Sequence, residues 1–166
     1  MNRRLLIIVL MACLLPLGMQ AQQGTFRFAQ LTDIHLTPNN PNPTEDLLRS
    51  VAQINATDSI DFVLVTGDLT EEGDRTTMEK VKSCLDLLKV PYHVALGNHE
   101  TKWSDSGCTA FGEIFGGERF EFEHKGFLFL GFNSGPLMRM AYGHVVPQDI
   151  RWMTERMNQY NTGDPQ

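Results

Sequence analysis

The feature of this sequence that most constrains its fold is a set of three short apolar segments, each followed directly by polar residues. The segments are residues 26–31, 61–66 and 92–96. Their length and their content of aliphatic, β-branched and aromatic residues predict β-strands. The second is continuously apolar from Phe62 to Val65, which is typical of a strand buried on both faces of a parallel sheet.

Segments with the apolar spacing of helices separate these strands. The first follows the loop 37–43, which is rich in proline and asparagine, and Thr44 or a neighbour is its expected cap. The second begins with the capping-box spacing of Thr76 and Glu79. The apolar positions of the two helices are Leu47, Leu48, Val51 and Ile54, and then Met78, Val81, Cys84, Leu85 and Leu88. The alternation predicts an α/β fold with a parallel βαβαβ sheet and right-handed crossovers.

The remainder of the chain predicts an antiparallel strand pair and a helix. Residues 119–123 and 127–132 alternate in a way that favours strands turning at Lys125-Gly126, and a last helix is expected from about Pro147 to Tyr160. The stretch 103–117 is expected to be a loop.

The polar residues after the three apolar segments carry the chemistry. Asp33 and His35 follow the first segment, Asp68 follows the second, and Asn98 and His99 follow the third. The carboxyl ends of parallel strands share one edge of a sheet, so these side chains are predicted to meet on one rim. Each cluster alone is also typical of a helix cap, a solvated loop acid or a packed core imidazole, but their joint occurrence favours a functional site.

The clusters Asp33-Ile34-His35, Gly67-Asp68 and Gly97-Asn98-His99-Glu100 resemble the first three motifs of the calcineurin-like metallophosphoesterase superfamily. The resemblance covers about residues 26–160 and extends to exported bacterial members in the stretches 127–134 and 148–153. It implies the first half of a four-layer α/β/β/α sandwich, in which the parallel βαβαβ unit is followed by an antiparallel strand pair and a helix.

The resemblance also implies a function: hydrolysis of small-molecule phosphate esters by a binuclear metal centre, with a metal-bridging hydroxide as the nucleophile. Asp33 and His35 would hold one ion, Asp68 would bridge both, and Asn98 would hold the second. The ions would be two divalent or trivalent transition-metal ions, and these ligand types do not choose among Mn, Fe and Zn.

By the same resemblance, His99 and Glu100 are the predicted catalytic residues. His99 would lie over the phosphate and either stabilise developing charge or protonate the leaving oxygen. Glu100 would orient His99. Whether the substrate is a monoester or a diester stays open.

The later family motifs, a lone histidine and then Gly-His-x-His, find no match. Gly143-His144-Val145-Val146 begins like the last motif but ends in valine. His124 is expected to be an exposed residue beside a turn, and His93 to pack on the sheet or to line the site. Residues 24–166 are therefore expected to be the N-terminal portion of the domain, with an incomplete site and little activity, and the alternative is a non-catalytic metal- or phosphate-binding domain.

The first 21 residues have the layout of a secretory signal peptide. A basic start at Arg3 and Arg4 precedes an apolar run, and cleavage is expected after Ala21, which predicts a periplasmic or secreted protein with no membrane segment after cleavage. Without those two arginines the chain carries 12 basic and 20 acidic side chains, a net charge of −8. So acidic a domain argues against a nucleic-acid surface.

Two further alternatives can be weighed from the residues. Cys84 lies on an apolar helix face, so a disulfide with Cys108 is not expected. A nucleotide-binding fold of another type would need a glycine-rich loop after the first strand, and residues 31–36 contain no glycine.

Overall fold

The computed structural model of the protein describes residues 24–136 and 142–162. The expected signal peptide, residues 1–21, lies outside the described residues. Within the described ranges, no helix combines the length and the apolar character that crossing a membrane requires.

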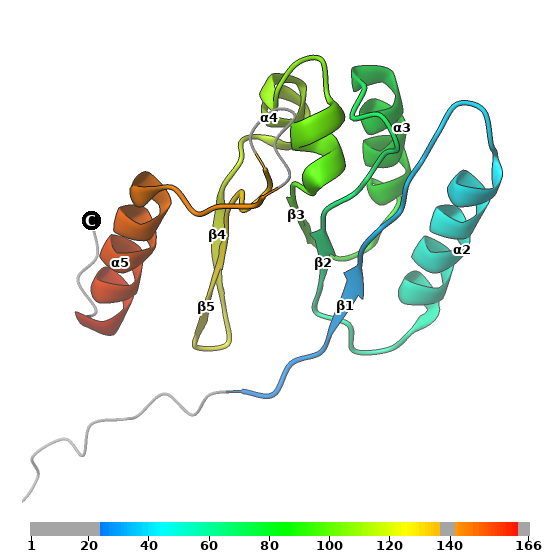
Figure 1. Ribbon diagram of the computed structural model, residues 1–166. Helices are drawn as coiled ribbons and strands as arrows, with labels where there is room; N and C mark the ends of the chain where they lie inside the picture. Colours follow the sequence, from blue (N-terminus) through cyan, green and yellow to red (C-terminus); the bar gives the residue numbers. More distant parts are fainter. Residues whose placement is uncertain (1–23, 137–141, 163–166) are drawn as a thin grey trace, which may run out of the picture.

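The first half of the described chain forms a parallel sheet. Its strands are β1 (Phe28–Leu31), β2 (Phe62–Thr66) and β3 (Tyr92–Ala95), in the order β1-β2-β3. Leu31 pairs with Val65, and Thr66 pairs with Ala95, so the three carboxyl ends lie level at one edge. The predicted parallel βαβαβ unit is confirmed, and the shared edge is the upper one in Figure 1.

Helices α2 (Asn42–Ala56) and α3 (Arg75–Leu85) cover one face of this sheet. Val63 and Val65 point from β2 into the core between the sheet and the helices. They pack with apolar residues from both helices: Leu47, Val51, Met78, Val81, Cys84 and Leu85. These residues confirm most of the two predicted apolar stripes, whereas Leu48 is 40% exposed.

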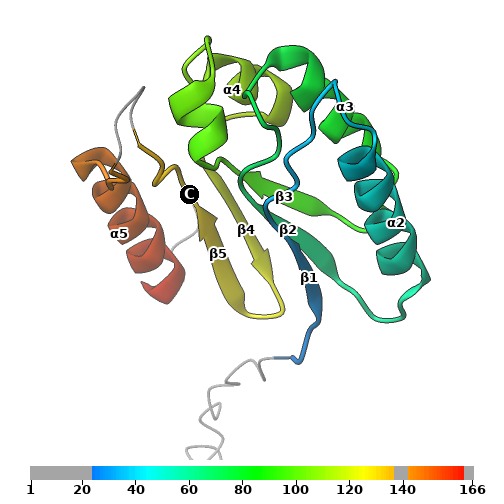
Figure 2. The same cartoon turned by 45° about the vertical axis from the view of Figure 1, so that its right-hand side comes forward.

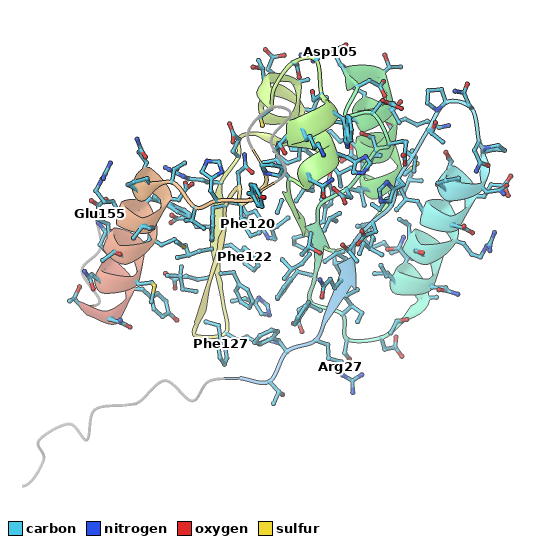
Figure 3. All side chains as sticks on the ribbon, in the orientation of Figure 1. Arg27, Asp105, Phe120, Phe122, Phe127 and Glu155 are labelled. Atoms are coloured by element: carbon cyan, nitrogen blue, oxygen red, sulfur yellow. The ribbon has the colours of Figure 1, made fainter. Side chains whose placement is uncertain are left out.

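The opposite face of the sheet packs on a hairpin of β4 (Phe120–His124) and β5 (Phe127–Gly131), which turns at Lys125-Gly126 as predicted. The ring of Phe62 on β2 lies 5.0 Å from those of Phe122 and Phe129. Phe120 and Phe122 lie between the two sheets in Figure 3. Along β2, the valines face the helices and Phe62 faces the hairpin. Both faces of the strand are therefore buried, and this is why its residues are continuously apolar.

Helix α5 (Pro147–Thr162) lies beyond the hairpin and contacts β5. From one side to the other, Figure 2 shows helices, the parallel sheet, the hairpin and α5. This arrangement confirms the predicted α/β/β/α layers.

Both predicted helix caps are wrong. Helix α2 begins at Asn42, two residues before Thr44, because Pro41 already has a helical φ of −75° and Pro43 lies in the first turn, where its missing N–H costs nothing. The Thr44 hydroxyl is buried without a hydrogen-bond partner. Helix α3 is capped by Asp74, whose side chain accepts a hydrogen bond from the Thr77 N–H at 2.9 Å, in place of the predicted Thr76–Glu79 box.

The stretch 103–117, predicted to be a loop, contains a short helix, α4 (Thr109–Phe115), and follows a π-helical turn, η1 (His99–Trp103). Helix α4 places Ala110 and Phe111 in the core against α3. The helix has only seven residues. Gly112 in its interior disfavours a helix. Seven residues are also too few for an apolar periodicity to be recognised in the sequence.

Two histidines outside the predicted site belong to the packing between the sheets. His93 stacks on Phe122 with the ring centroids 3.7 Å apart, and burial lowers its pKa. This contact confirms the expected packing role. The prediction that His124 is exposed is wrong: its side chain is 27% exposed and its ring meets Phe26 and Phe62 edge-on, because the alternation along β4 turns it inward with Phe122.

Candidate metal centre

Two loops at the carboxyl edge of the sheet are bound to each other through their backbones. The N–H of Asp33 donates to the carbonyl of Gly67 at 3.2 Å, and the N–H of His35 donates to that of Asp68 at 3.0 Å. The pattern continues with Leu36 donating to the Leu69 carbonyl at 3.0 Å. These backbone hydrogen bonds therefore fix the distances between the two loops that carry the predicted metal ligands, independently of a bound ion.

Three of the predicted ligands have an unusual backbone conformation. Asp33, His35 and Asp68 have φ values of 53°, 49° and 50°, in the left-handed region that non-glycine residues seldom adopt. They are three of the six described non-glycine residues with positive φ. Such conformations cost about 1–3 kcal/mol each and concentrate at functional sites. The backbone hydrogen bonds between the two loops stabilise them.

Gly67 and Gly97 allow the loops after β2 and β3 to come into contact. A Cβ atom on Gly97 would lie 2.0 Å from Oδ1 and 2.2 Å from the backbone N of Asp68, and one on Gly67 would lie 2.6 Å from the Cα of Gly97. Gly67 also has a φ of 99°. Both positions thus require glycine, as the sequence pattern indicated.

Asp33, His35 and Asp68 form a group whose atoms suit a metal ion. The Nε2 of His35 lies 3.9 Å from Asp33 Oδ1 and 4.0 Å from Asp68 Oδ2. Two ligand atoms that each lie about 2.1 Å from one ion are at most about 4.2 Å apart. The ligand spacing and the mixture of imidazole with carboxylate therefore fit a transition-metal ion.

Asn98 joins this group at the wall of an open cavity of about 570 Å³. Asp33, Asp68 and Asn98 all line this cavity, and among the described residues of its lining Lys102 is the basic one. The N–H of His99 donates to Asp68 Oδ1 at 3.1 Å, which links the loop after β3 to the loop after β2. The structure thus brings together the four predicted ligands and His99.

Glu71 also belongs to the site, and the sequence analysis missed it. Its Oε2 lies 3.0 Å from His35 Nδ1, and its backbone carbonyl lies 2.6 Å from His99 Nδ1. The two imidazole rings meet at right angles with their centroids 4.6 Å apart. The signal in the sequence was an acid only three residues after Asp68, still on the same rim.

Glu100 has contacts different from those predicted. Its carboxylate is fully buried and accepts hydrogen bonds from three backbone N–H groups: Leu69 at 2.9 Å, Thr70 at 3.1 Å and Gly97 at 2.9 Å. Burial raises the pKa of Glu100, and the backbone donors oppose this shift. Glu100 thus joins two loops, and the backbone of Glu71 contacts the His99 ring. That Glu100 orients His99 stays a prediction.

Residues 26–163 match the sequence model of the calcineurin-like phosphoesterase family. The chain belongs to this family. Calcineurin-like phosphoesterases are metal-dependent, which agrees with the ligand group of Asp33, His35 and Asp68.

Curated relatives of this calcineurin-like chain include proteins named for one reaction. A "Probable cyclic nucleotide phosphodiesterase" of Rhodopseudomonas palustris is 33% identical over 97 residues, covering 55% of this chain and 33% of that protein. A 3′,5′-cyclic-nucleotide phosphodiesterase of Nostoc is 24% identical over 136 residues, covering 78% and 50%. The chain thus spans half or less of the length of these relatives. A solved structure of a purple acid phosphatase from yellow lupin seeds matches 66% of this chain and 24% of its own, with 19% identity and a TM-score of 0.43.

Other nucleophilic or metal-binding side chains of this calcineurin-like chain lie apart from the group. His144 lines a different cavity, together with Arg119 and Asp149. Cys84 and Cys108 are both free thiols, and burial raises the pKa of each, that of Cys108 to about 11. Neither thiol is therefore a thiolate nucleophile at neutral pH.

Proposed function

We propose that this chain takes part in hydrolysing small-molecule phosphate esters with two metal ions. Asp33 and His35 would hold one ion, Asp68 would lie between both, and Asn98 would hold the second. When bound, such ions supply an activated water as nucleophile and neutralise charge on the phosphate. The observation that carries the proposal is the convergence of Asp33, His35 and Asp68 on the cavity lined by Asn98, in a member of a phosphoesterase family.

The ring of His99 has a defined protonation pattern. A backbone carbonyl only accepts hydrogen bonds, so the Nδ1 atom 2.6 Å from the Glu71 oxygen carries a hydrogen. Neutral His99 then has an acceptor at Nε2. Protonation of a leaving oxygen by His99 therefore requires the doubly protonated ring, which also supplies positive charge toward the phosphate.

Lys102 supplies a second cationic group at the cavity. Its ammonium lies 4.6 Å from the centre of the Trp103 ring, a cation–π contact that limits where the side chain points. Because Lys102 lines the same cavity as Asp33 and Asn98, it is placed to pair with an anionic substrate.

The relatives named as cyclic nucleotide phosphodiesterases support a phosphodiester as the first substrate to test. The alternative function is metal or phosphate binding without turnover. The small number of ligands for the second ion favours this alternative. Among the described residues, Asp68 and Asn98 alone are proposed to bind this ion, whereas a closed tetrahedral site has four ligands. The assignment of residues 24–166 to the N-terminal portion of a domain stays a prediction.

The experiment that tests the function uses the purified chain loaded with Mn, Fe or Zn. Bound metal is counted after dialysis, and hydrolysis of 3′,5′-cyclic AMP, bis-p-nitrophenyl phosphate and p-nitrophenyl phosphate is measured. For hydrolysis we expect about two ions per chain and a low turnover that Asp68→Asn abolishes. Asp105→Asn, an exposed control of equal charge, should leave that turnover unchanged. Stoichiometric metal without turnover would favour the binding function. Turnover that survives Asp68→Asn would contradict the metal site.

We further propose that residues 1–21 direct export and are removed, giving a periplasmic or secreted protein. The basic start, the apolar run and the small residue at Ala21 support this. Cell fractionation and N-terminal sequencing test it, with Gln22 as the expected first residue. Intact Met1 in a cytoplasmic fraction would rule it out.

A further inference from the structure

We propose that Glu71 is a positioning residue that sets the protonated nitrogen of two imidazoles at once, those of His35 and His99. Through His35 it would determine how tightly the site binds metal. The inference rests on the proposed metal site, and it adds the residue that prepares the site for an ion.

The first step concerns the side chain of Glu71. Its Oε2 lies 3.0 Å from His35 Nδ1, and an ionised carboxylate only accepts hydrogen bonds. The hydrogen of neutral His35 is therefore on Nδ1, and the lone pair is on Nε2. That Nε2 is the atom lying 3.9 Å from Asp33 and 4.0 Å from Asp68, so the free lone pair is on the nitrogen that a metal requires.

The second step concerns the backbone of Glu71. Its carbonyl oxygen lies 2.6 Å from His99 Nδ1, which again places the hydrogen on Nδ1. One residue thus fixes His35 through its carboxylate and His99 through its carbonyl. Removing the Glu71 side chain should affect His35 alone, and this asymmetry makes the inference testable.

The third step separates positioning from packing. The N–H of Glu71 donates to the carbonyl of Leu36 at 2.9 Å, so its backbone is held by the loop after β1. The Glu71 side chain, in contrast, is 50% exposed. A substitution there leaves no buried cavity, and we expect the metal-free fold to keep its stability.

One rival arrangement uses the same atoms. His35, Glu71 and His99 also lie close enough to bind an ion themselves, with Glu71 as a direct ligand. In that case metal binding would depend on Glu71 and His99 and would survive the loss of Asp33 and Asp68. In the proposed arrangement, metal binding would not survive the loss of Asp33 and Asp68.

The principal experiment measures metal affinity by calorimetry with Mn²⁺ and Zn²⁺, together with the visible spectrum of the Co²⁺-loaded chain. We expect Glu71→Ala to weaken binding about 10- to 100-fold and to change the Co²⁺ spectrum. Glu71→Gln should restore part of the affinity, because its amide oxygen still accepts from Nδ1. Glu72→Gln, at the exposed neighbouring acid, should bind as the wild type does.

A second measurement needs no metal. Long-range ¹H–¹⁵N NMR reports which ring nitrogen of a neutral imidazole carries the hydrogen. We expect hydrogen on Nδ1 of both His35 and His99 in the wild type. In Glu71→Ala, we expect His35 to lose this preference while His99 keeps it.

Three results would overturn the inference: wild-type affinity in Glu71→Ala, an unchanged His35 tautomer in that variant, or full metal binding after Asp33→Asn combined with Asp68→Asn. Failure of the proposed function looks different. A chain that binds metal without turnover would refute hydrolysis alone, because affinity and tautomer are both measured without substrate.

Discussion

At the scale of single residues, Glu100 shows how a buried charge can serve the backbone. Its Oε1 accepts from Leu69 and Thr70, and its Oε2 accepts from Gly97, so the carboxylate joins the loops after β2 and β3. Both oxygens are acceptors at a fully buried position. An amide in this position would turn an NH₂ group toward a backbone N–H whichever way it was oriented.

We therefore expect Glu100→Gln to destabilise the fold despite its similar shape. Each buried N–H group left without an acceptor costs about 1–3 kcal/mol. Urea unfolding would measure the loss, with Glu155→Gln on the exposed side of α5 as the control for charge. Equal stability of the two variants would show that Glu100 does not hold the loops together.

Gly97 gives a second expectation at this scale. A methyl group there would meet Asp68 at 2.0 Å and 2.2 Å, so Gly97→Ala should destabilise the chain by about 3 kcal/mol and weaken metal binding. Gly112→Ala is the matched control, because its Cβ would meet nothing closer than 4.0 Å in helix α4. That variant should be neutral or slightly more stable. Thermal unfolding and metal calorimetry of both variants check this, and a Gly97→Ala protein like the wild type would contradict it.

The ligand residues were predictable and their supporting contacts were not. Asp33, His35, Asp68 and Asn98 follow strands, and strand ends of a parallel sheet meet by a general rule. The contacts of Glu71 and Glu100 depend on how two loops approach each other, which no local pattern encodes. The predicted cap of α3 failed for a related reason: Asp74, and not Thr76, has the extended backbone conformation of a cap residue, and no local pattern encodes that conformation.

At the scale of elements, one acid adds polar contacts to the aromatic packing between the parallel sheet and the hairpin. Asp61, just before β2, accepts from the Lys125 ammonium at 2.7 Å and from the Arg27 N–H at 2.9 Å. His124 Nε2 lies 3.1 Å from the same carboxylate. The hydrogen bond from Lys125, and next that from Arg27, lower the pKa of Asp61 to about 2.

This lowered pKa gives a pH-dependent contribution to stability. The ionised Asp61 favours the folded state above the ordinary aspartate pKa of about 3.9, and the contribution disappears as the pH falls toward 2. Asp61→Asn should therefore be less stable than the wild type at neutral pH, and the difference should vanish near pH 2. Urea titrations across this range measure it, with Asp58→Asn as the exposed control. A difference in stability between Asp61→Asn and the wild type that persists near pH 2 would show that packing, and not the charge of Asp61, causes it.

At the scale of the whole molecule, the layers place every proposed ligand on one edge of one sheet. The acidic group of Asp33, Asp68 and Glu71 lies there in a chain that already carries a net charge of −6. A bound cation would relieve this local repulsion and would bind the folded state in preference to the unfolded one.

Metal ions should therefore stabilise the whole chain. At a free concentration of about 100 times the dissociation constant, the expected gain is about 2.7 kcal/mol. Thermal unfolding with Mn²⁺ or Zn²⁺ should show a higher Tm that EDTA reverses and that Asp33→Asn or Asp68→Asn removes. The same increase in Tm in those variants would show that the stabilising ion binds elsewhere.

The cavity at the metal centre has two walls that differ in how freely they can be changed. One wall consists of the loops bound to each other through their backbones, where Gly67, Asp68 and Gly97 tolerate little. The other includes Ser134, Gly135, Pro136 and Gly143, which come from the chain after β5. A mutant library meant to alter substrate preference should therefore randomise the second wall together with Lys102 and keep the codons of the first wall constant.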